Sequence, residues 1–311
     1  MTAPLVSIIT VNYNQTAVTS EFLQSLSLLT YSNYEVIVVD NASSQPSASL
    51  KGNFPTIIHI TSPKNLGFAG GNNIGLLYAK GEYVFFINND TTVTPDVLNV
   101  LVNYIQQNER CGIVCPKIKY QSQPDIIQYA GAIGLHPITC RSHGIGYLQK
   151  DDGRYDDSRK TDLPNGAAML VPMRLIKQLG TMSEMFFLYY EELDWAARFH
   201  KAGYEIHYVG SACIFHKESI STGKNSPFKT FYLYRNRLLY IRRNSKGWQR
   251  LVSSMFFTFL SSPAHIIKHL LKGEWKHTAS IVRALVWHIR HKAFGEHDVH
   301  SSTLKNSLIV E

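Results

Sequence analysis

The sequence predicts an α/β protein with a mostly parallel central sheet flanked by helices on both faces. Apolar, strand-like runs alternate with helix-like segments through the first hundred residues, which is the pattern of a parallel sheet covered on both sides. The runs are short and continuous, as in strands buried on both faces. Three of them end on Asn or Asp, so polar side chains are expected at one edge of the sheet.

Each element follows from its residues. Residues 5–12 predict a first strand, 16–29 a helix, and 34–40 and 57–61 two further strands. Residues 74–79 continue a helix into a fourth strand at 83–87. After a polar, loop-like stretch at 121–162, small residues at 164–168 lead into an apolar strand that reaches 171. An aromatic run at 185–190 then enters a helix that extends to about Ala202, with Gly203 as its stop signal.

The polar residues at the strand ends are candidates for a ligand site. Asn12 and Asn14 follow the first strand, and Asp40 ends the second. The fourth strand stops on a polar tripeptide, Asn88, Asn89 and Asp90. A carboxylate at such an edge suits a divalent cation shared with substrate phosphates, because magnesium takes few protein ligands. The alternative is ordinary turn chemistry, with Thr94 or Asp96 capping the next helix.

A glycine-rich segment at 65–75 is a second candidate. Gly67, Gly70 and Gly71 would let the backbone approach a ligand, and the helix start that follows offers N–H groups to an anion. The spacing is neither the dinucleotide fingerprint nor a P-loop. We therefore expect this loop to contact a phosphate or a sugar.

Charge and cysteine content limit the class of protein. Residues 229–292 hold 13 Lys and Arg against one acid, a net charge of +12, so the rest of the chain carries −4 of the total of +8. Cys111, Cys115, Cys140 and Cys213 form no disulfide or metal-ligand pattern and are expected to be reduced core thiols. The N-terminus predicts no signal peptide. No apolar run of 18 or more residues is present, so no membrane-spanning helix is expected.

The ordered set of these motifs resembles inverting family 2 glycosyltransferases of the GT-A fold, closest to the rhamnosyltransferase-like branch that builds bacterial envelope polysaccharides. The resemblance covers roughly residues 4–245. The matching segments are 6–14, 38–43, 65–72, 88–90, 165–168 and 186–194. It implies a nucleotide-diphospho-sugar transferase with a donor half at about 1–115, an acceptor half at about 116–245, and a C-terminal helical extension at 246–311.

The resemblance also implies roles for individual residues. Asp40 would bind the donor base, and Asp90 and His216 would hold Mg²⁺ or Mn²⁺. Asn88 stands where the family commonly has the first acid of an Asp-x-Asp motif, which predicts weak metal affinity. Glu191 and Glu192 fill the place of a catalytic acidic pair, with Glu192 as the base. The remaining donor-binding residues implied are Asn12, Asn14, Asn65, Gly67, Gly70, Gly71, Asn72, Asn88 and Asn89. The acceptor-binding residues implied are Asn165, Gly166, Tyr190 and Asp194.

Two other functions remain open from the residues. One is a non-catalytic protein that binds anionic lipid or nucleic acid through its basic C-terminal segment, although an acidic pair behind an aromatic run would serve no purpose in it. The other is a nucleotidyltransferase, which would need a basic loop near the N-terminus, whereas residues 5–32 contain no Lys or Arg. We expect no nucleic-acid partner.

The C-terminal segment, 246–311, predicts basic amphipathic helices. Residues 251–260 are apolar, too few to span a bilayer, and are interrupted at Pro263. Ile281, Leu285 and Ile289 recur at helical spacing, with Arg283 and Arg290 between or beside them. Such a pattern is typical of a helix lying in a membrane interface. We expect a cytoplasmic protein in peripheral contact with the anionic inner leaflet. Packing of these helices on the catalytic domain or on a second subunit is the alternative.

Overall fold

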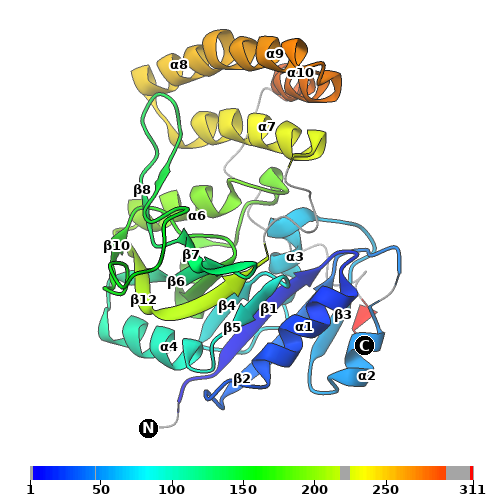
Figure 1. Ribbon diagram of the computed structural model, residues 1–311, viewed down its shortest axis with the longest axis vertical. Helices are drawn as coiled ribbons and strands as arrows, with labels where there is room; N and C mark the ends of the chain where they lie inside the picture. The colour runs from blue at the N-terminus through cyan, green and yellow to red at the C-terminus, as the bar shows by residue number, and fades with distance from the viewer. Residues whose placement is uncertain (1–2, 46, 218–224, 292–308, 311) are drawn as a thin grey trace.

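The computed structural model describes residues 3–45, 47–217, 225–291 and 309–310. A large mixed sheet forms the base of the molecule, and a stack of helices stands above it (Figure 1). The strands are β1 (Val6–Asn12), β2 (Tyr34–Asp40), β3 (Ile58–Thr61), β4 (Tyr83–Ile87), β5 (Thr91–Val93), β6 (Cys111–Tyr120), β7 (Gln123–Tyr129), β8 (Ala132–Ile133), β9 (His143–Gly144), β10 (Arg159–Thr161), β11 (Ala168–Pro172), β12 (Glu205–His216) and β13 (Ile309–Val310).

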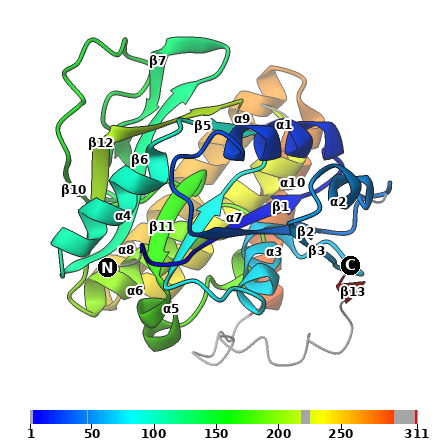
Figure 2. The ribbon, with the colours of Figure 1, turned by 90° about the horizontal axis from the view of Figure 1, so that it is seen from below.

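The helices cover both faces of the sheet and continue beyond it. Figure 2 shows α1 on one side of β1 and α3 on the other. The helices are α1 (Thr16–Leu26), α2 (Ser49–Asn53), α3 (Gly67–Leu76), α4 (Val97–Gln107), α5 (Met173–Leu179), α6 (Glu191–Lys201), α7 (Pro227–Asn244), α8 (Gly247–Met255), α9 (Ser262–Leu271) and α10 (Trp275–Arg290), with a 3-10 turn η1 (Glu184–Phe186) and a π-helical turn η2 (Phe256–Ser261).

Strand order explains how distant motifs meet. Among the described residues the main sheet runs β10-β12-β6-β11-β4-β1-β2-β3-β13, with β5 beside β12 and β7 beside β6. The neighbours β3, β2, β1 and β4 are parallel, as are β6 and β12, while β11 is antiparallel to both of its neighbours. The carboxyl ends of β1, β2 and β4 therefore share one edge, with Asn12 paired opposite Asp40. The predicted mostly parallel sheet is confirmed.

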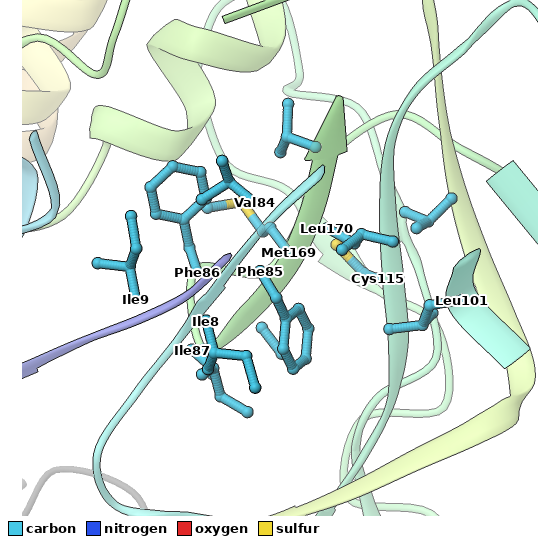
Figure 3. Close-up of a cluster of buried hydrophobic side chains, with 14 of the residues drawn as sticks. Ile8, Ile9, Val84, Phe85, Phe86, Ile87, Leu101, Cys115, Met169 and Leu170 are labelled. Carbon is cyan, nitrogen blue, oxygen red and sulfur yellow. The ribbon is translucent and has the colours of Figure 1, made fainter. Parts of the chain in front are cut away.

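The central strands have a continuous apolar core. Ile8 and Ile9 of β1 and Phe85 and Phe86 of β4 are fully buried, and Figure 3 shows them with Leu101 of α4 among the buried side chains of the sheet. Because these strands are covered on both faces, successive residues are all apolar rather than alternating with polar ones. This explains why 34–40 and 83–87 were predicted with the bounds that the structure has.

Three regions differ from the expectation. Helix α3 begins at Gly67 and includes the glycines predicted to lie in a loop. The stretch 121–162, predicted as loop, contains β7 to β10. At the C-terminus, 309–310 forms β13 against β3 rather than a helix, and 292–308 of the predicted helical extension lies outside the described residues. The cysteines have free thiols: Cys111, Cys115 and Cys140 are buried, and Cys213 is partly buried.

Helices α7 to α10 form the upper layers of the molecule (Figure 1). Pro263 does not interrupt the helix as predicted; it lies in the first turn of α9, directly after a π-helical turn. The π-helical turn η2 immediately before it joins α8 to α9 without a break. In the part of the chain that the structure describes, every helix is too short or too polar to cross a bilayer.

Candidate active site

The polar residues at the end of β1 support the site from behind and do not line it. Asn12 is fully buried; its amide donates to Ser43 Oγ (3.2 Å), and its carbonyl oxygen accepts from Thr19 Oγ1 (2.8 Å). Asn14, with a left-handed φ of 55°, accepts from the backbone N–H of Ser44 at 2.7 Å. Both side chains therefore fix the loop that follows β2.

Asp40 also faces that loop. Its carboxylate is buried and accepts hydrogen bonds from the backbone N–H groups of Ser43 (2.9 Å) and Ser47 (3.1 Å) and from the Ser47 hydroxyl. The Ser47 hydroxyl is in turn 2.8 Å from His59 Nε2. Asp40 thus shapes the loop into which a donor base is predicted to bind, and that base contact stays a prediction.

Asn41, which the sequence analysis did not name as a site residue, links this loop to α3. Its amide donates to Asn65 Oδ1 (3.0 Å) and to the Gly67 carbonyl (2.9 Å), and its Oδ1 accepts from the Leu66 N–H (2.9 Å). Asn65 also accepts from the Gly67 N–H (2.8 Å). The signal was present in the sequence, because Asn41 directly follows Asp40 in the same motif.

The glycines of α3 have packing reasons. A Cβ on Gly67 would lie 2.0 Å from the Phe187 carbonyl oxygen, one on Gly70 2.5 Å from Leu66 Cβ, and one on Gly71 2.9 Å from both methyl carbons of Val11. Glycine costs about 1 kcal/mol within a helix, and here it lets α3 lie against β1 and the aromatic loop. Asn72 bonds back to the Phe68 carbonyl at 3.0 Å. Of Gly67, Gly70, Gly71 and Asn72, only Gly67 lines the cavity described next.

A cavity of about 630 Å³ opens at the strand edge. Its polar lining comes from Asn65 of the glycine segment, the tripeptide after β4 and His216. Its apolar lining includes Phe68, Phe187 and Phe228. The Phe187 ring is stacked on Tyr232 of α7, with ring centroids 4.9 Å apart. The volume lies in the range typical of small-molecule sites.

Asp90 and His216 meet inside this cavity. Strand β5 pairs with the end of β12, so that His216 lies opposite Thr91, and the Lys217 N–H donates to the Asp90 carbonyl (2.9 Å). The imidazole Nδ1 is 2.8 Å from Gln128 Oε1 of β7. That oxygen accepts, so Nδ1 is the nitrogen that donates to it, and Nε2 lies 3.0 Å from Asp90 Oδ1.

These two residues fit a divalent cation. Asp90 Oδ1 is buried without a hydrogen-bond partner, because the contact to His216 is close but not aligned as a hydrogen bond. Two ligands about 2.1 Å from one octahedral ion are about 3 Å apart. Asn88, whose amide is 3.4 Å from His216 Nε2, adds no charge. Within the described residues no cluster of three or more His, Cys, Asp or Glu supports a metal, so a bound ion would depend on further ligands from the substrate.

Strain is concentrated in the aromatic loop before α6. Phe187, Tyr189 and Tyr190 all have left-handed φ values, 62°, 68° and 75°, and each such residue costs about 1–3 kcal/mol. The amide of Asn236 on α7 donates to the carbonyls of residues 186, 188 and 189, at 2.8, 2.7 and 2.7 Å. Arg235 adds a bond to the Met185 carbonyl at 2.8 Å. Helix α7 therefore holds the loop in its strained form.

The acidic pair begins α6 directly after this loop. Glu191 is buried, whereas Glu192 is partly exposed, and one carboxylate oxygen of each accepts no hydrogen bond. Burial raises the pKa of Glu192 to about 7. Burial and the charge of Glu192 raise the pKa of Glu191 well above its usual range. Glu192 is thus the carboxyl that ionises near neutral pH.

Glu192 lines a second, smaller cavity of about 340 Å³. Tyr189 lines both cavities and so lies where they meet. Tyr190 lines the smaller one, and its hydroxyl accepts from Arg237 Nε (3.0 Å). Arg141 and Arg237 are basic lining residues that the sequence did not indicate, because nothing local marks a loop residue and a helix residue as neighbours.

The other predicted acceptor residues divide into two groups. Gly166 lies beside Glu192, since a Cβ there would be 3.9 Å from Glu192 Cγ, and Asn165 Oδ1 caps the turn by accepting from the Ala167 N–H (2.9 Å). Asp194 is buried and accepts from Asn244 Nδ2 (2.8 Å) and Arg243 Nε (3.1 Å). It lines neither cavity, so the acceptor-binding role predicted for Asp194 is not supported by its position.

The sheet edge therefore has two adjoining cavities, one with a candidate metal-binding pair, Asp90 and His216, and one with a carboxylate, Glu192. Comparisons with solved structures identify the fold. The mannosyltransferase PcManGT from Pyrobaculum calidifontis, in complex with GDP-Man and Mn²⁺, superimposes with a TM-score of 0.58 at 15% identity, over 94% of this chain and 77% of that one. TarS 1-349 of S. aureus, in complex with UDP-GlcNAc, gives 0.59 at 17% identity, over 90% and 80%. The fold is that of the GT-A glycosyltransferases.

Sequence comparisons give the family. Residues 7–169, more than half of the chain, match the profile of Glycosyl transferase family 2, and the chain belongs to this family of glycosyltransferases. It is 26% identical to the low-salt glycan biosynthesis hexosyltransferase Agl10 of Haloferax volcanii, over 75% of this chain and 74% of that protein. It is 24% identical to the N-acetylglucosaminyl-diphospho-decaprenol L-rhamnosyltransferase of Mycobacterium tuberculosis, over 78% and 86%. The non-catalytic and nucleotidyltransferase alternatives are set aside.

Proposed function

We propose that the protein is an inverting glycosyltransferase that moves a sugar from a nucleoside-diphosphate donor to a hydroxyl group of a glycan or lipid-linked acceptor in bacterial envelope polysaccharide synthesis. The donor would occupy the larger cavity and the acceptor the smaller one. The observation that carries this proposal is Glu192, whose carboxylate lines the smaller cavity and has an oxygen without a hydrogen-bond partner. Glu191 is buried and lines neither cavity, which supports Glu192 as the base.

Transfer then takes one displacement. The Glu192 carboxylate removes the proton from the acceptor hydroxyl, and the acceptor oxygen bonds to the anomeric carbon of the donor. The bond from that carbon to the diphosphate oxygen breaks, and its electron pair leaves with the diphosphate. A single displacement inverts the anomeric configuration. Among the described residues that line the smaller cavity, Glu192 is the only carboxylate, so a second carboxylate to act as a nucleophile is not supplied there.

Asp90 and His216 would hold Mg²⁺ or Mn²⁺, with Gln128 fixing the imidazole tautomer. The bound ion would supply positive charge beside the leaving diphosphate. Two structural neighbours are complexes that contain Mn²⁺, which supports this proposal. Lys229, which also lines the larger cavity, is a further cation near the place of the diphosphate.

For the donor we propose rhamnose linked to thymidine diphosphate. The similarity to a relative named as an L-rhamnosyltransferase supports this choice. A panel of nucleotide sugars, scored by donor hydrolysis and thermal shift, tests it. Preference for a hexose donor that carries a 6-hydroxyl group would refute rhamnose without affecting the proposed reaction.

We also propose peripheral contact with the cytoplasmic face of the membrane through α8 to α10. Trp248, Met255 and Phe259 recur at helical spacing along α8 and η2 and are 77%, 52% and 70% exposed. Leu271 and Trp275 extend the apolar surface at 84% and 68% exposure. The neighbouring exposed cations are Lys268, Lys272 and Lys276. Each cation contributes about 1 kcal/mol near an anionic leaflet, and apolar side chains beside them favour the interface.

Vesicle flotation tests the membrane contact. Trp248→Ser with Phe259→Ser should reduce flotation of the full chain with anionic vesicles at low salt. Leu28→Ser is the matched control, because Leu28 is 64% exposed but lies at the end of α1 on the catalytic domain. Equal flotation of the double variant and the control would make these helices packing elements.

The catalytic assignment is tested by two amide substitutions. Glu192→Gln should lower turnover by about 10²–10⁴-fold, the range for a lost general base, while donor binding by calorimetry stays unchanged. Glu191→Gln is the neighbouring control and should retain most of the turnover. If Glu192→Gln were active and Glu191→Gln were not, Glu191 would be the base.

A further inference from the structure

Arg235, which bonds the aromatic loop before α6, is itself in contact with α10. Its side chain is buried, and its guanidinium donates to the carbonyls of Met185 (2.8 Å) and Phe186 (2.5 Å). The same guanidinium lies over two aromatic rings, with 4.6 Å to the centroid of Tyr232 on α7 and 5.0 Å to that of Trp287 on α10. Contacts between a cation and a ring are strongest where water is excluded. Helix α10 therefore reaches the group that holds the loop.

The residue after Trp287 holds the main chain at the same position. His288 is buried; its Nε2 donates to the Arg235 carbonyl (2.8 Å), and its Nδ1 accepts from Arg242 Nη1 (3.0 Å). Burial lowers the pKa of His288 to about 4, so the ring is neutral at neutral pH and can donate from one nitrogen while the other accepts. Two neighbouring residues of α10 thus contact both the side chain and the main chain of Arg235.

These contacts connect the outer helices to the acidic pair. Figure 1 shows α10 above α7 and α7 above α6, and α7 contacts both α10 and η1. The loop that Arg235 bonds leads directly into α6, which begins with Glu191 and Glu192. We propose that Trp287 is a positioning residue: it holds Arg235 where that arginine keeps the aromatic loop in its strained form, and so sets the place of Glu192. The inference rests on the proposed role of Glu192 as the base.

Packing of α10 on α7 does not by itself require an aromatic ring at this position. Leu285, on the same helix, already packs in an apolar cluster with Leu238 and Ile241 of α7. A further apolar side chain would serve such packing as well as an aromatic one does. A ring over a buried guanidinium does more, because it fixes a cation that is also bonded to two carbonyls of the loop.

Two substitutions of Trp287 separate the aromatic contact from the packing. Trp287→Leu keeps an apolar side chain but has no π face for the guanidinium, whereas Trp287→Phe keeps one. Amide hydrogen exchange is measured at residues 187–190 and compared with residues 84–86 of β4, which are fully buried and report global unfolding. Relative to β4, exchange at 187–190 should be about tenfold faster in Trp287→Leu and within about threefold of the unaltered protein in Trp287→Phe.

Leu285→Ala is the matched control on the same helix. It removes apolar contact from the cluster with Leu238 and Ile241, so it should lower the urea midpoint of unfolding. It should leave the ratio of exchange at 187–190 to exchange at β4 unchanged. If Trp287→Leu changed that ratio no more than Leu285→Ala does, or if Trp287→Phe failed to restore it, α10 would only pack on α7 and the inference would be wrong.

Turnover gives a second measurement. The substrate is thymidine-diphospho-rhamnose, or the nucleotide sugar that the donor panel selects, and its hydrolysis is followed with Mn²⁺ present by release of the nucleoside diphosphate. Turnover at saturating donor should fall about tenfold in Trp287→Leu and recover in Trp287→Phe, in parallel with the exchange rates.

The two measurements separate this inference from the proposed function. If the unaltered protein hydrolyses no nucleotide sugar, the proposed function fails, and the exchange rates still decide whether α10 holds the loop. If it hydrolyses the donor but Trp287→Leu and Trp287→Phe turn over alike, the positioning role of Trp287 alone is refuted.

Discussion

Replacing Asn236 with alanine should destabilise the protein and loosen the aromatic loop that precedes Glu191 and Glu192. Asn236 is fully buried, and its amide donates to three carbonyls of that loop, at Phe186, Leu188 and Tyr189. The loop contains three residues with left-handed φ, so it would relax if these bonds were lost. The Phe186 carbonyl would keep its bond from Arg235.

The size of the effect follows from the bonds removed. At about 1 kcal/mol for a typical net hydrogen bond, with a larger penalty for a carbonyl left buried, we expect Asn236→Ala to lower the free energy of unfolding by about 2–4 kcal/mol. Urea titration measures this loss through the unfolding midpoint. Amide hydrogen exchange should show faster exchange at residues 187–190, and turnover should fall because Glu192 begins the helix that follows.

Asn99→Ala provides the matched control. Asn99 is on α4 and makes one exposed hydrogen bond, to Thr30 Oγ1 (2.7 Å), so its loss should change stability by no more than about 0.5 kcal/mol. If Asn236→Ala unfolded at the same urea concentration as Asn99→Ala, and exchange at 187–190 were unchanged, α7 would not be holding the loop.

Three further predictions concern the site and its support. Turnover should rise with pH through about 7, because burial raises the pKa of Glu192 to about 7 and the base must lose its proton first; a rate profile flat through that pH would contradict it. Gly75→Ala should lower the free energy of unfolding by about 1–3 kcal/mol, since its Cβ would lie 2.5 Å from Ile9 Cγ2. The control is Gly52→Ala, whose Cβ would have nothing within 4 Å and should leave the urea midpoint unchanged or higher. Asp90→Asn should abolish the effect of Mg²⁺ or Mn²⁺ on nucleotide binding by calorimetry, and an undiminished metal effect would exclude Asp90 as a ligand.

Local sequence signals were sufficient for the strands and insufficient for α3. Buried parallel strands are continuous apolar runs, so β2 and β4 could be read directly. Helix α3 contains Gly67, Gly70, Gly71 and Gly75, which intrinsic propensity assigns to a loop. The glycines have a packing reason, because β1 lies so close that any side chain at Gly71 or Gly75 would overlap Val11 or Ile9. That tertiary reason has no local sequence signal.

The candidate site could be predicted only where the family resemblance supplied its residues, and their roles stay predictions. The pairing of Asp90 with His216 depends on β5 lying beside β12, which no local pattern indicates. The acceptor role of Asp194 stays a prediction. An acid in the first turn of a helix looks the same in sequence whether it faces a ligand or an arginine, and in the structure Asp194 faces Arg243. Arg141 and Arg237 were missed because the cavity that unites them is formed only by folding.

The hold of α7 on the aromatic loop has a consequence for how the protein matures. The sheet is complete once β12 has been made, apart from the short strand β13. The left-handed turns before α6 lack the hydrogen bonds from Arg235 and Asn236 until those residues arrive from further along the chain. During synthesis the nascent chain should therefore form its sheet first. Catalytic competence is then acquired late, when α7 docks.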